Sequence, residues 1–354
     1  MDEIARHVTE GIPVTLITGF LGSGKTTLLT RLLAHPGMDR VAVIINEFGE
    51  VGLDHLLVAR RVEDVRLLAN GCLCCSVRGE LVATLADLYA RAADGTIPGF
   101  DRVIIETTGL ADPLPVLQTV VGDAVISRLF RLDGIVTTVD AANADDTLDR
   151  HFESVKQVTL ADTLLITKGD LVAPDALAAL RGRLRRLNPE AELATVAFGE
   201  IPPERLLGLS SAPKISAQRA GSPEPAGHEH HEHGPHDAEI QTFSLTFDAP
   251  ILRSGLRVWI DLLAAFRGSD LLRVKGLLNV EGEPVVVNAV QHLFHPLQTL
   301  PTWPTADRRS HFVFITRGIG EATLARTFAA FGFQSGALEP RRFAEFVALA
   351  SRFR

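Results

Sequence analysis

The chain has 354 residues, of which 46% are hydrophobic and 22% charged, a composition typical of a globular protein with room for two domains. The net charge of −8 argues against an electrostatic grip on nucleic acid or on an acidic membrane. No apolar run approaches the ~18 residues of a spanning helix, and the first residues lack the basic and apolar segments of a signal peptide. We therefore expect a cytoplasmic protein that binds neither nucleic acid nor membrane.

Residues 12–35 read IPVTLITGFLGSGKTTLLTRLLAH, which predicts a buried strand, a glycine-rich turn and an amphipathic helix. The turn matches the P-loop pattern in its required strand–helix setting, whereas a bare turn of this kind would bind no ligand. Lys25 is expected to reach the β- and γ-phosphates as a catalytic residue, and the Thr26 hydroxyl to ligate Mg²⁺. The residues expected to contact nucleotide here are Gly19, Gly22, Ser23, Gly24, Lys25, Thr26 and Thr27.

The first two hundred residues alternate apolar runs with helical stretches. Four further strands are predicted within 40–50, 102–113, 132–141 and 162–170, and helices over 78–94 and 174–187. Continuous Val, Ile and Leu runs of this kind are typical of a parallel sheet covered on both faces. The expected fold class is therefore α/β, and ligands should bind at the carboxyl ends of the strands.

The three cysteines of the chain, Cys72, Cys74 and Cys75, lie within NGCLCC at 70–75. Adjacent thiols are poorly placed to bridge each other, and thiols stay reduced in the cytosol, so a structural disulfide is not expected. Inert buried thiols, a redox switch and metal ligands remain possible, and clustering in one loop favours metal ligands. Three thiolates alone do not complete a tetrahedral site.

The segment LITKGDL offers Lys168 and Asp170 in the spacing of the Asn-Lys-x-Asp motif that reads guanine. A carboxylate can accept from the N1–H and N2–H groups of guanine together, a pair that adenine lacks. Thr167 stands where that motif has Asn, so one contact differs. We favour GTP over ATP as the nucleotide.

The composition changes near residue 208, where a stretch rich in Ser, Pro, Gly and His begins. We predict a P-loop domain over 1–208, a flexible linker over 209–239 and a smaller α+β domain over 240–354. The elements expected in the last domain are a strand over 239–248, a helix over 253–267, a hairpin turning at 281–284, a strand over 311–318 and a helix over 320–331.

Histidines of the linker form a second candidate metal site, of weak and accessory character, since imidazole suits Zn²⁺, Ni²⁺ and Co²⁺ alike. The alternative is a plain tether. These histidines are His228, His230, His231, His233 and His236. In the last domain, Arg273, Lys275, His292 and His295 either face the P-loop domain or a client protein or are structural, and a structural role is favoured for His295.

The segments GFLGSGKTTLL, NEFGEVGLD, NGCLCC, ETTGLADP, TKGD and RVKG occur in the order found in the CobW-like metallochaperone GTPases, and the chain resembles that family over essentially its whole length. The segment ETTGLADP is closer to the zinc-chaperone branch of that family than to its cobalamin-pathway branch. The resemblance implies a P-loop GTPase domain, a smaller C-terminal domain and Zn²⁺ carried on the Cys-x-Cys-Cys loop.

The resemblance also implies that Glu106 and Gly109 belong to a switch segment that senses Mg²⁺ and the γ-phosphate, with Glu106 as a catalytic residue and Mg²⁺ ligand. Glu50 is the candidate for a fourth zinc ligand, direct or through water. Glu47 is either part of that site or of a solvated acidic turn. Asp140 lies at the same edge with no assigned role.

The favoured function is a GTP-hydrolysing zinc metallochaperone that transfers its metal to a client metalloprotein. In this hypothesis GTP orders the loops at 46–54 and 106–113 and thereby reshapes the cysteine loop between them. The alternatives are a non-catalytic metal buffer or sensor, and a GTPase that delivers cobalt, nickel or iron to another metalloenzyme.

Overall fold

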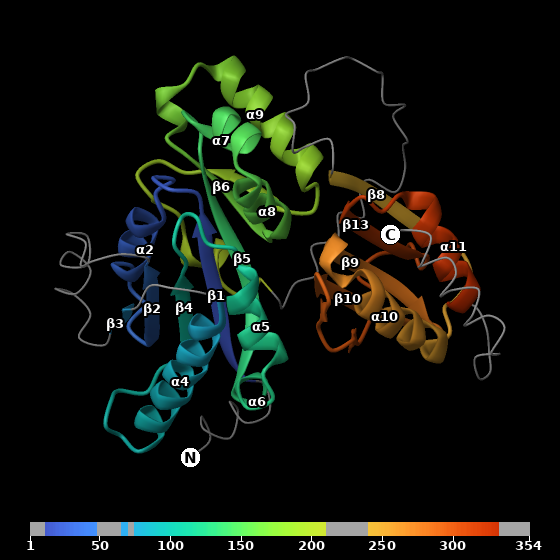
Figure 1. The fold of residues 1–354 in the computed structure, drawn as a ribbon, viewed down its shortest axis with the longest axis horizontal. Coiled ribbons are helices and arrows are strands. Elements are labelled where there is room, and N and C mark those ends of the chain that lie inside the picture. The colour runs from blue at the N-terminus through green and yellow to red at the C-terminus, as the bar shows by residue number, and fades with distance from the viewer. Residues whose placement is uncertain (1–10, 48–64, 70–73, 210–239, 333–354) are drawn as a thin grey trace. The chain divides into compact units, whose positions relative to one another are not determined.

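The computed structural model describes residues 11–47, 65–69, 74–209 and 240–332 (Figure 1). The chain divides into two compact units. The first comprises residues up to 185 together with 191–212, and the second comprises 186–190 and the residues from 213 onward. No helix in the described ranges is long and apolar enough to cross a membrane.

The first unit is built on a seven-stranded sheet in the order β3-β2-β4-β1-β5-β6-β7. Every neighbouring pair runs parallel, so the carboxyl ends of all strands lie along one edge, and the expected α/β class is confirmed. The strands are β1 (Ile12–Gly19), β2 (Val41–Glu47), β3 (Val65–Ala69), β4 (Arg102–Glu106), β5 (Phe130–Asp140), β6 (Thr163–Thr167) and β7 (Glu192–Thr195).

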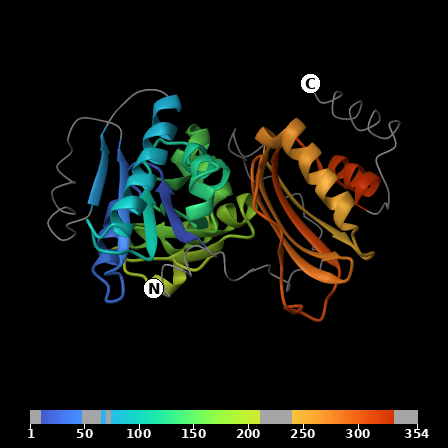
Figure 2. The same ribbon diagram turned by 90° about the horizontal axis from the view of Figure 1, so that it is seen from below.

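Helices lie on both sides of this sheet, as Figures 1 and 2 show. The helix predicted over 78–94 begins four residues earlier, at Cys74, and the helix predicted over 174–187 is found with those bounds. The helices are α2 (Lys25–Leu33), α4 (Cys74–Ala93), α5 (Leu114–Gly122), α6 (Ile126–Leu129), α7 (Ala144–Arg150), α8 (Phe152–Leu160) and α9 (Pro174–Leu187), with 3-10 turns at Gly169–Leu171 and Pro203–Arg205.

Helix α2 is fixed on the sheet by its apolar face. Leu28, Leu29 and Leu32 are buried against Ile17 of β1 and neighbouring strand residues. Burial of each leucine contributes roughly 1.5–3 kcal/mol. This packing therefore fixes the helix start, where the P-loop residues stand.

The amino edge of the same sheet is held by a buried carboxylate. Asp133 of β5 accepts hydrogen bonds from Arg102 Nη1 at the start of β4 and from the Gly208 backbone N–H at 2.7 Å. Thr15 Oγ1 lies 3.4 Å from the same carboxylate. These contacts join β1, β4, β5 and the last described turn of the first unit at one point.

The second unit contains a six-stranded antiparallel sheet in the order β11-β10-β9-β13-β8, with β12 paired to β10. The predicted hairpin is confirmed, since β9 and β10 turn at Glu281 and Gly282, whose positive φ values of 56° and 96° suit a tight turn. The elements are β8 (Ile240–Phe247), α10 (Arg253–Arg267), a 3-10 turn at Gly268–Asp270, β9 (Leu271–Val280), β10 (Glu283–Val290), β11 (Leu293–Phe294), β12 (Gln298–Thr299), β13 (Ser310–Arg317) and α11 (Glu321–Phe331).

Helices α10 and α11 cover one face of this sheet with an aromatic core (Figure 2). Trp259 of α10 is fully buried, and its ring centroid lies 4.9 Å from that of Phe328 and 5.6 Å from that of Phe312. Its Nε1–H donates to Thr327 Oγ1 at 3.2 Å, which satisfies the one polar group of the indole.

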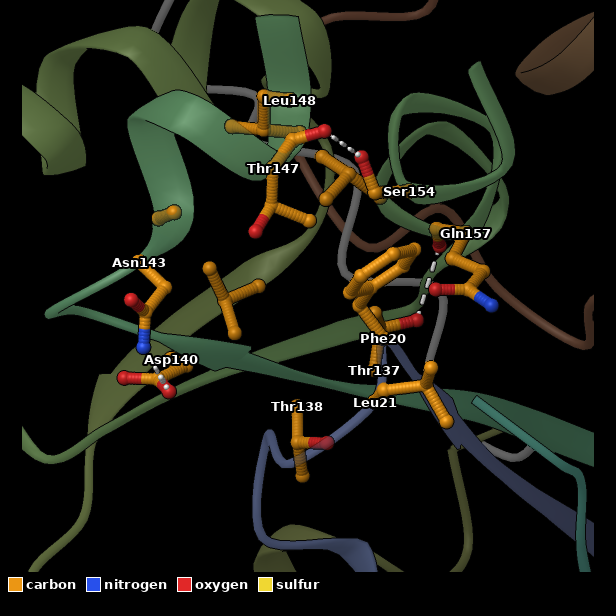
Figure 3. A pocket seen from close by; sticks show the side chains of 13 residues that line it. Phe20, Leu21, Thr137, Thr138, Asp140, Asn143, Thr147, Leu148, Ser154 and Gln157 are labelled. Carbon is orange, nitrogen blue, oxygen red and sulfur yellow. Dashed lines mark hydrogen bonds between the residues drawn. The ribbon is translucent and has the colours of Figure 1, made fainter. Parts of the chain in front are cut away.

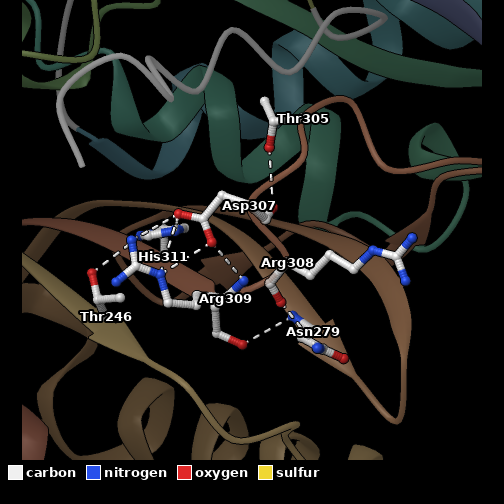
Figure 4. A network of polar contacts seen from close by, with 8 residues as sticks. Thr246, Asn279, Thr305, Asp307, Arg308, Arg309 and His311 are labelled. Carbon is white, nitrogen blue, oxygen red and sulfur yellow. Dashed lines mark hydrogen bonds and ion pairs between the residues drawn. The ribbon is translucent and has the colours of Figure 1, made fainter. Parts of the chain in front are cut away.

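A polar network fixes the loop that enters β13 (Figure 4). Asp307 accepts from Arg309 Nη2 at 2.8 Å, and His311 Nε2 lies 3.1 Å from the same carboxylate. Thr246 of β8 contacts His311 Nδ1 at 3.1 Å. Hydrogen bonds from the Arg309 side chain and backbone hold the pKa of Asp307 well below its ordinary value. The network thus joins this loop to two neighbouring strands.

Replacing Thr327 by Val should lower the free energy of unfolding of the second unit by about 1–3 kcal/mol, because the buried indole N–H loses its acceptor while the side-chain shape is kept. Denaturant titration followed by tryptophan fluorescence measures this change. Thr327→Ser retains the hydroxyl and serves as the control. Equal stability of Thr327→Val and the wild type would contradict the assigned role of this bond.

Candidate nucleotide-binding site

The P-loop follows the carboxyl end of β1, and its three glycines, Gly19, Gly22 and Gly24, all have positive φ values, which L side chains rarely adopt. Gly24 precedes α2 with φ 94°. A Cβ at Gly19 would lie 2.4 Å from the carbonyl and hydroxyl oxygens of Thr138. The loop therefore lies directly against β5, with its N–H groups at the positive end of α2.

The Lys25 ammonium lies over the loop itself. It donates to the carbonyl oxygens of Gly19 at 3.0 Å and Phe20 at 3.1 Å, and only 8% of the residue is exposed. The single cation of the loop is thus placed among the backbone groups that would surround a phosphate.

Thr26 and Glu106 meet across the site. The Thr26 hydroxyl donates to Glu106 Oε1 at 3.0 Å, and Glu106 is 3% exposed at the end of β4. The two residues are 80 positions apart in the sequence and were both predicted as Mg²⁺ ligands. By donating its proton to the carboxylate, the hydroxyl keeps its lone pairs for a cation. Hard oxygen donors of this kind suit Mg²⁺.

Buried hydroxyl groups join the loop to the neighbouring strands, which the sequence analysis did not anticipate. Ser23 Oγ lies 2.6 Å from Thr138 Oγ1, and Thr107 Oγ1 donates to Thr18 Oγ1 at 2.8 Å. Thr167, which replaces the Asn of the guanine motif, donates to the Ser23 carbonyl at 2.9 Å. The substitution therefore leaves β6 connected to the P-loop.

Lys168 is oriented by Asp140, the residue to which the sequence gave no role. Lys168 Nζ donates to Asp140 Oδ2 at 2.7 Å, and Asn143 Nδ2 donates to the same oxygen at 2.9 Å. Burial would raise the pKa of Asp140, but the hydrogen bonds from Lys168, Asn143 and the Ala142 N–H outweigh it, so the pKa lies below its ordinary value. Asp140 thus holds Lys168 through a charged hydrogen bond, and its position as the last residue of β5, beside β6, was the available sequence signal.

Asp170 and Thr27, two of the residues predicted to contact nucleotide, are exposed to solvent. Asp170 lies in the 3-10 turn after β6, two residues beyond Lys168, whose φ of 54° is left-handed. The carboxylate predicted to read guanine is therefore accessible beside the anchored Lys168.

Gly109 brings the segment 106–113 against the P-loop. A Cβ there would lie 2.5 Å from the backbone nitrogen of Leu21. Helix α8 holds the segment from the other side, because Gln157 Nε2 donates to the carbonyls of Gly109 at 3.2 Å and Ala111 at 3.1 Å. Lys156 Nζ adds an ion pair with Asp112 at 2.5 Å. Gly109 could be identified from the sequence, whereas its support by α8 could not.

A small pocket lies between the P-loop and helices α7 and α8 (Figure 3). Phe20 and Leu21 of the loop line it together with residues of β5 and with Ser154 and Gln157 of α8. Its volume of about 30 Å³ has room for water and not for a nucleotide. On the loop side, the Phe20 ring contacts the His151 ring in a tilted arrangement, with centroids 4.6 Å apart. The pocket therefore lies beside the P-loop, between the loop and helices α7 and α8.

The predicted zinc ligands lie largely outside the described residues. Cys74 and Cys75 are the first residues of α4, and their side chains are not among those described. Cys72, Glu50 and the linker histidines His228, His230, His231, His233 and His236 lie outside the described ranges. Within those ranges, no group of three metal-ligating side chains that could hold a metal ion is found.

The first strand of the parallel sheet leads through a glycine-rich loop into a helix. Lys168, held by Asp140, and the exposed Asp170 lie beside that loop. These features define a P-loop nucleotide-binding protein. Two family models match the chain: the CobW/HypB/UreG nucleotide-binding domain over residues 13–195, and the cobalamin synthesis protein cobW C-terminal domain over residues 240–332. The chain therefore belongs to the CobW family, and the resemblance found in its motifs is confirmed.

Relatives of the chain include proteins named for zinc. It is 36% identical over 320 residues to the zinc chaperone YjiA of Escherichia coli, covering 90% of this chain and 98% of that protein. It is 36% identical over 197 residues to the zinc-regulated GTPase metalloprotein activator 1 of Schizosaccharomyces pombe, covering 54% of this chain and 47% of that protein. The crystal structure of Zn(II)-bound YjiA GTPase matches with a TM-score of 0.68 at 29% identity, covering 91% of this chain and 99% of that one.

Replacing Gly109 by Ala should slow hydrolysis of GTP by about 10- to 100-fold, because the new methyl group displaces the P-loop backbone at Leu21. Phosphate release at saturating GTP measures the effect. Gly79→Ala is the matched control, since a Cβ there meets nothing within 4 Å. An unchanged rate for Gly109→Ala would show that this contact does not position the loop.

Proposed function

We propose that this protein is a zinc metallochaperone that hydrolyses GTP and delivers Zn²⁺ to a client metalloprotein. The observation that carries the nucleotide half is the hydrogen bond between Thr26 and Glu106, which joins the P-loop to the switch segment at 3.0 Å. The proposal that the protein carries zinc is supported by its similarity to proteins named zinc chaperone and zinc-regulated GTPase, and by the three cysteines at 72–75 of this chain.

Hydrolysis needs stabilisation of charge on the transferred phosphoryl group more than covalent chemistry. The Lys25 ammonium would exchange its two loop carbonyls for phosphate oxygens. Thr26 and Glu106 would hold Mg²⁺, which neutralises phosphate charge when bound. Gly109 would respond to the γ-phosphate, a role supported by its close approach to the loop backbone at Leu21.

Guanine selectivity is assigned to Asp170, whose carboxylate is exposed beside the anchored Lys168. The carboxylate accepts from both N1–H and N2–H of guanine, whereas adenine offers no such pair of donors. The Thr167 hydroxyl contributes to this site indirectly, by holding the P-loop carbonyl of Ser23.

Zinc is the cargo, and Cys72, Cys74 and Cys75 are proposed to carry it with Glu50 or water in the fourth position. Thiolates are strong zinc ligands, and a site with one exchangeable position suits a metal that must leave. The linker histidines are proposed to add weak, accessory metal binding.

The backbone of the sheet offers a route between the two ligands. Strand β3, which enters the cysteine loop, pairs with β2 so that Ala69 lies beside Glu47. On its other side β2 pairs with β4, where Ile45 lies beside Glu106. Strand β3, which precedes the cysteine loop in the sequence, therefore ends at the same sheet edge as Glu106, and in this proposal GTP changes zinc affinity through the loops that follow these strands.

Replacing Lys25 by Ala should reduce GTP hydrolysis by at least ~100-fold, because the cation that stabilises the phosphoryl group is lost. Steady-state phosphate release is the measurement. The melting temperature of the nucleotide-free variant controls for the two loop hydrogen bonds that Lys25 also makes. A folded Lys25→Ala protein that turns over GTP at the wild-type rate would refute the assignment.

Replacing Cys74 by Ala should lower zinc affinity by at least ~100-fold while leaving basal GTP hydrolysis in place, since one thiolate ligand is removed outside the phosphate site. Competition titration with a zinc chelator in the presence of GTP and of GDP is the test of the proposed function. In the wild type the two affinities should differ, because coupled ligands affect each other reciprocally.

Equal zinc affinity in both nucleotide states would exclude nucleotide-driven transfer and favour a metal buffer. Tighter binding of Co²⁺ or Ni²⁺ than of Zn²⁺, after correction for the general preference of nitrogen and sulfur sites among these metals, would favour another cargo.

A further inference from the structure

An exposed phenylalanine follows the last strand of the parallel sheet. Phe198 is 73% exposed, more than the other large apolar side chains that stand out at the surface of the described residues, among them Leu171 at 66% and Phe266 at 47%. A solitary exposed leucine or phenylalanine has little meaning by itself. Phe198 is of interest because of its position in the fold.

Phe198 lies beside the segment proposed to read guanine. Strand β7 pairs with β6, and beyond the paired strands the Val196 N–H donates to the Ile166 carbonyl at 2.8 Å. Phe198 lies two residues after Val196, and Lys168 lies two residues after Ile166. A Cβ at Gly169 would lie 3.0 Å from the Thr195 side chain, so the two loops are in contact where they leave the sheet.

The other side of the Phe198 loop packs on the helix that begins at the P-loop. A Cβ at Gly199 would lie 3.1 Å from the Thr27 carbonyl and from the backbone of Leu28. The loop that carries Phe198 therefore lies against the first turn of α2 through Gly199, and the strand that leads into it contacts the loop that carries Asp170 through Thr195. A base attached to a P-loop phosphate would bind beside these two loops, at the carboxyl ends of the strands.

The backbone at this point is held in an unusual conformation. Phe198 has φ 51° and Gly199 has φ 75°, and the Glu200 N–H closes the turn on the Ala197 carbonyl at 2.9 Å. Left-handed backbone is uncommon for a phenylalanine and is found where surrounding structure imposes it, often at ligand sites. Lys168, on the facing loop, is also left-handed with φ 54°. Two neighbouring loops, which follow the adjacent strands β6 and β7, thus each contain a non-glycine residue in a left-handed conformation.

We infer that the ring of Phe198 forms the stacking surface for the guanine base of the bound nucleotide. This inference rests on the proposed function, since it concerns the same nucleotide site. Asp170 selects the base by its hydrogen-bonding edge, whereas an aromatic face binds the flat surface of any base. Phe198 is therefore a positioning residue for affinity, and Asp170 determines selectivity.

The test compares Phe198→Ala, Phe198→Leu and Phe198→Tyr in the full-length protein. Calorimetric titration gives the dissociation constants for GTP, GDP, ITP and inorganic tripolyphosphate. Loss of base stacking should weaken the three nucleotides by about the same factor, ~10-fold, in Phe198→Ala, because stacking does not depend on the groups at the edge of the base. Phe198→Leu keeps apolar volume without an aromatic face and should lose most of this affinity, whereas Phe198→Tyr should stay within about twofold of the wild type.

Tripolyphosphate separates a base contact from a distorted loop, since it has phosphates and no base. Its affinity should not change in any Phe198 variant. Phe266→Ala removes an exposed aromatic side chain from the second unit and should bind every ligand as the wild type does.

Two results would overturn the inference and leave the proposed function intact. The first is a wild-type affinity for GTP in Phe198→Ala. The second is a loss of tripolyphosphate affinity in Phe198→Ala by the same factor as the loss of GTP affinity. Failure of the wild-type protein to bind any guanine nucleotide would overturn the proposed function and this inference with it. A GTP affinity that falls in Asp170→Asn and stays at the wild-type value in Phe198→Ala would locate the base on Asp170 alone.

Discussion

The nucleotide site depends on one buried carboxylate. Glu106 is 3% exposed at the end of β4, and a lone ionised carboxylate at such a place would be costly. The Thr26 hydroxyl, at the start of α2, donates to it and lies near the positive end of that helix. This bond joins the start of α2 to the end of β4. It therefore fixes the P-loop, which precedes Thr26, relative to the segment 106–113, which begins at Glu106. The hydroxyl pairs on either side of it, Ser23 with Thr138 and Thr107 with Thr18, extend the same frame to the neighbouring strands.

Much of this arrangement could be predicted from the sequence, and the limits have physical reasons. The P-loop and the long apolar strands were identified because glycine spacing and continuous hydrophobic runs are local signals. Strands β3 and β7 were missed, since runs of five and four residues at the two sheet edges carry little periodicity. The pairing of Asp140 with Lys168, 28 positions apart, arises from neighbouring strand ends and has no local signature. Gln157 was missed for the same reason, because a single glutamine in a helix resembles any surface residue until its carbonyl partners are seen.

Thr167 stands where the guanine motif has Asn, and the sequence predicted only that one contact differs at this position. The Thr167 hydroxyl nevertheless donates to the P-loop carbonyl of Ser23 and lies 3.3 Å from the carbonyl of Val139. A side chain one atom shorter than asparagine reaches these oxygens because β6 ends directly beside the loop. The cysteine loop, by contrast, is recognised from the sequence alone. Its proposed metal chemistry is argued from the spacing of the thiols, because the cysteine side chains are not among those described.

The buried Asp133 at the amino edge of the sheet makes part of the assembly of the sheet independent of the loops at its opposite edge. Its bonds to Arg102 and to the Gly208 N–H hold together β4, β5 and the last described turn of the first unit, away from the carboxyl ends of these strands. The loops that follow those carboxyl ends can therefore differ in sequence without loss of this connection, which separates the residues that hold the sheet from the residues that can meet a ligand.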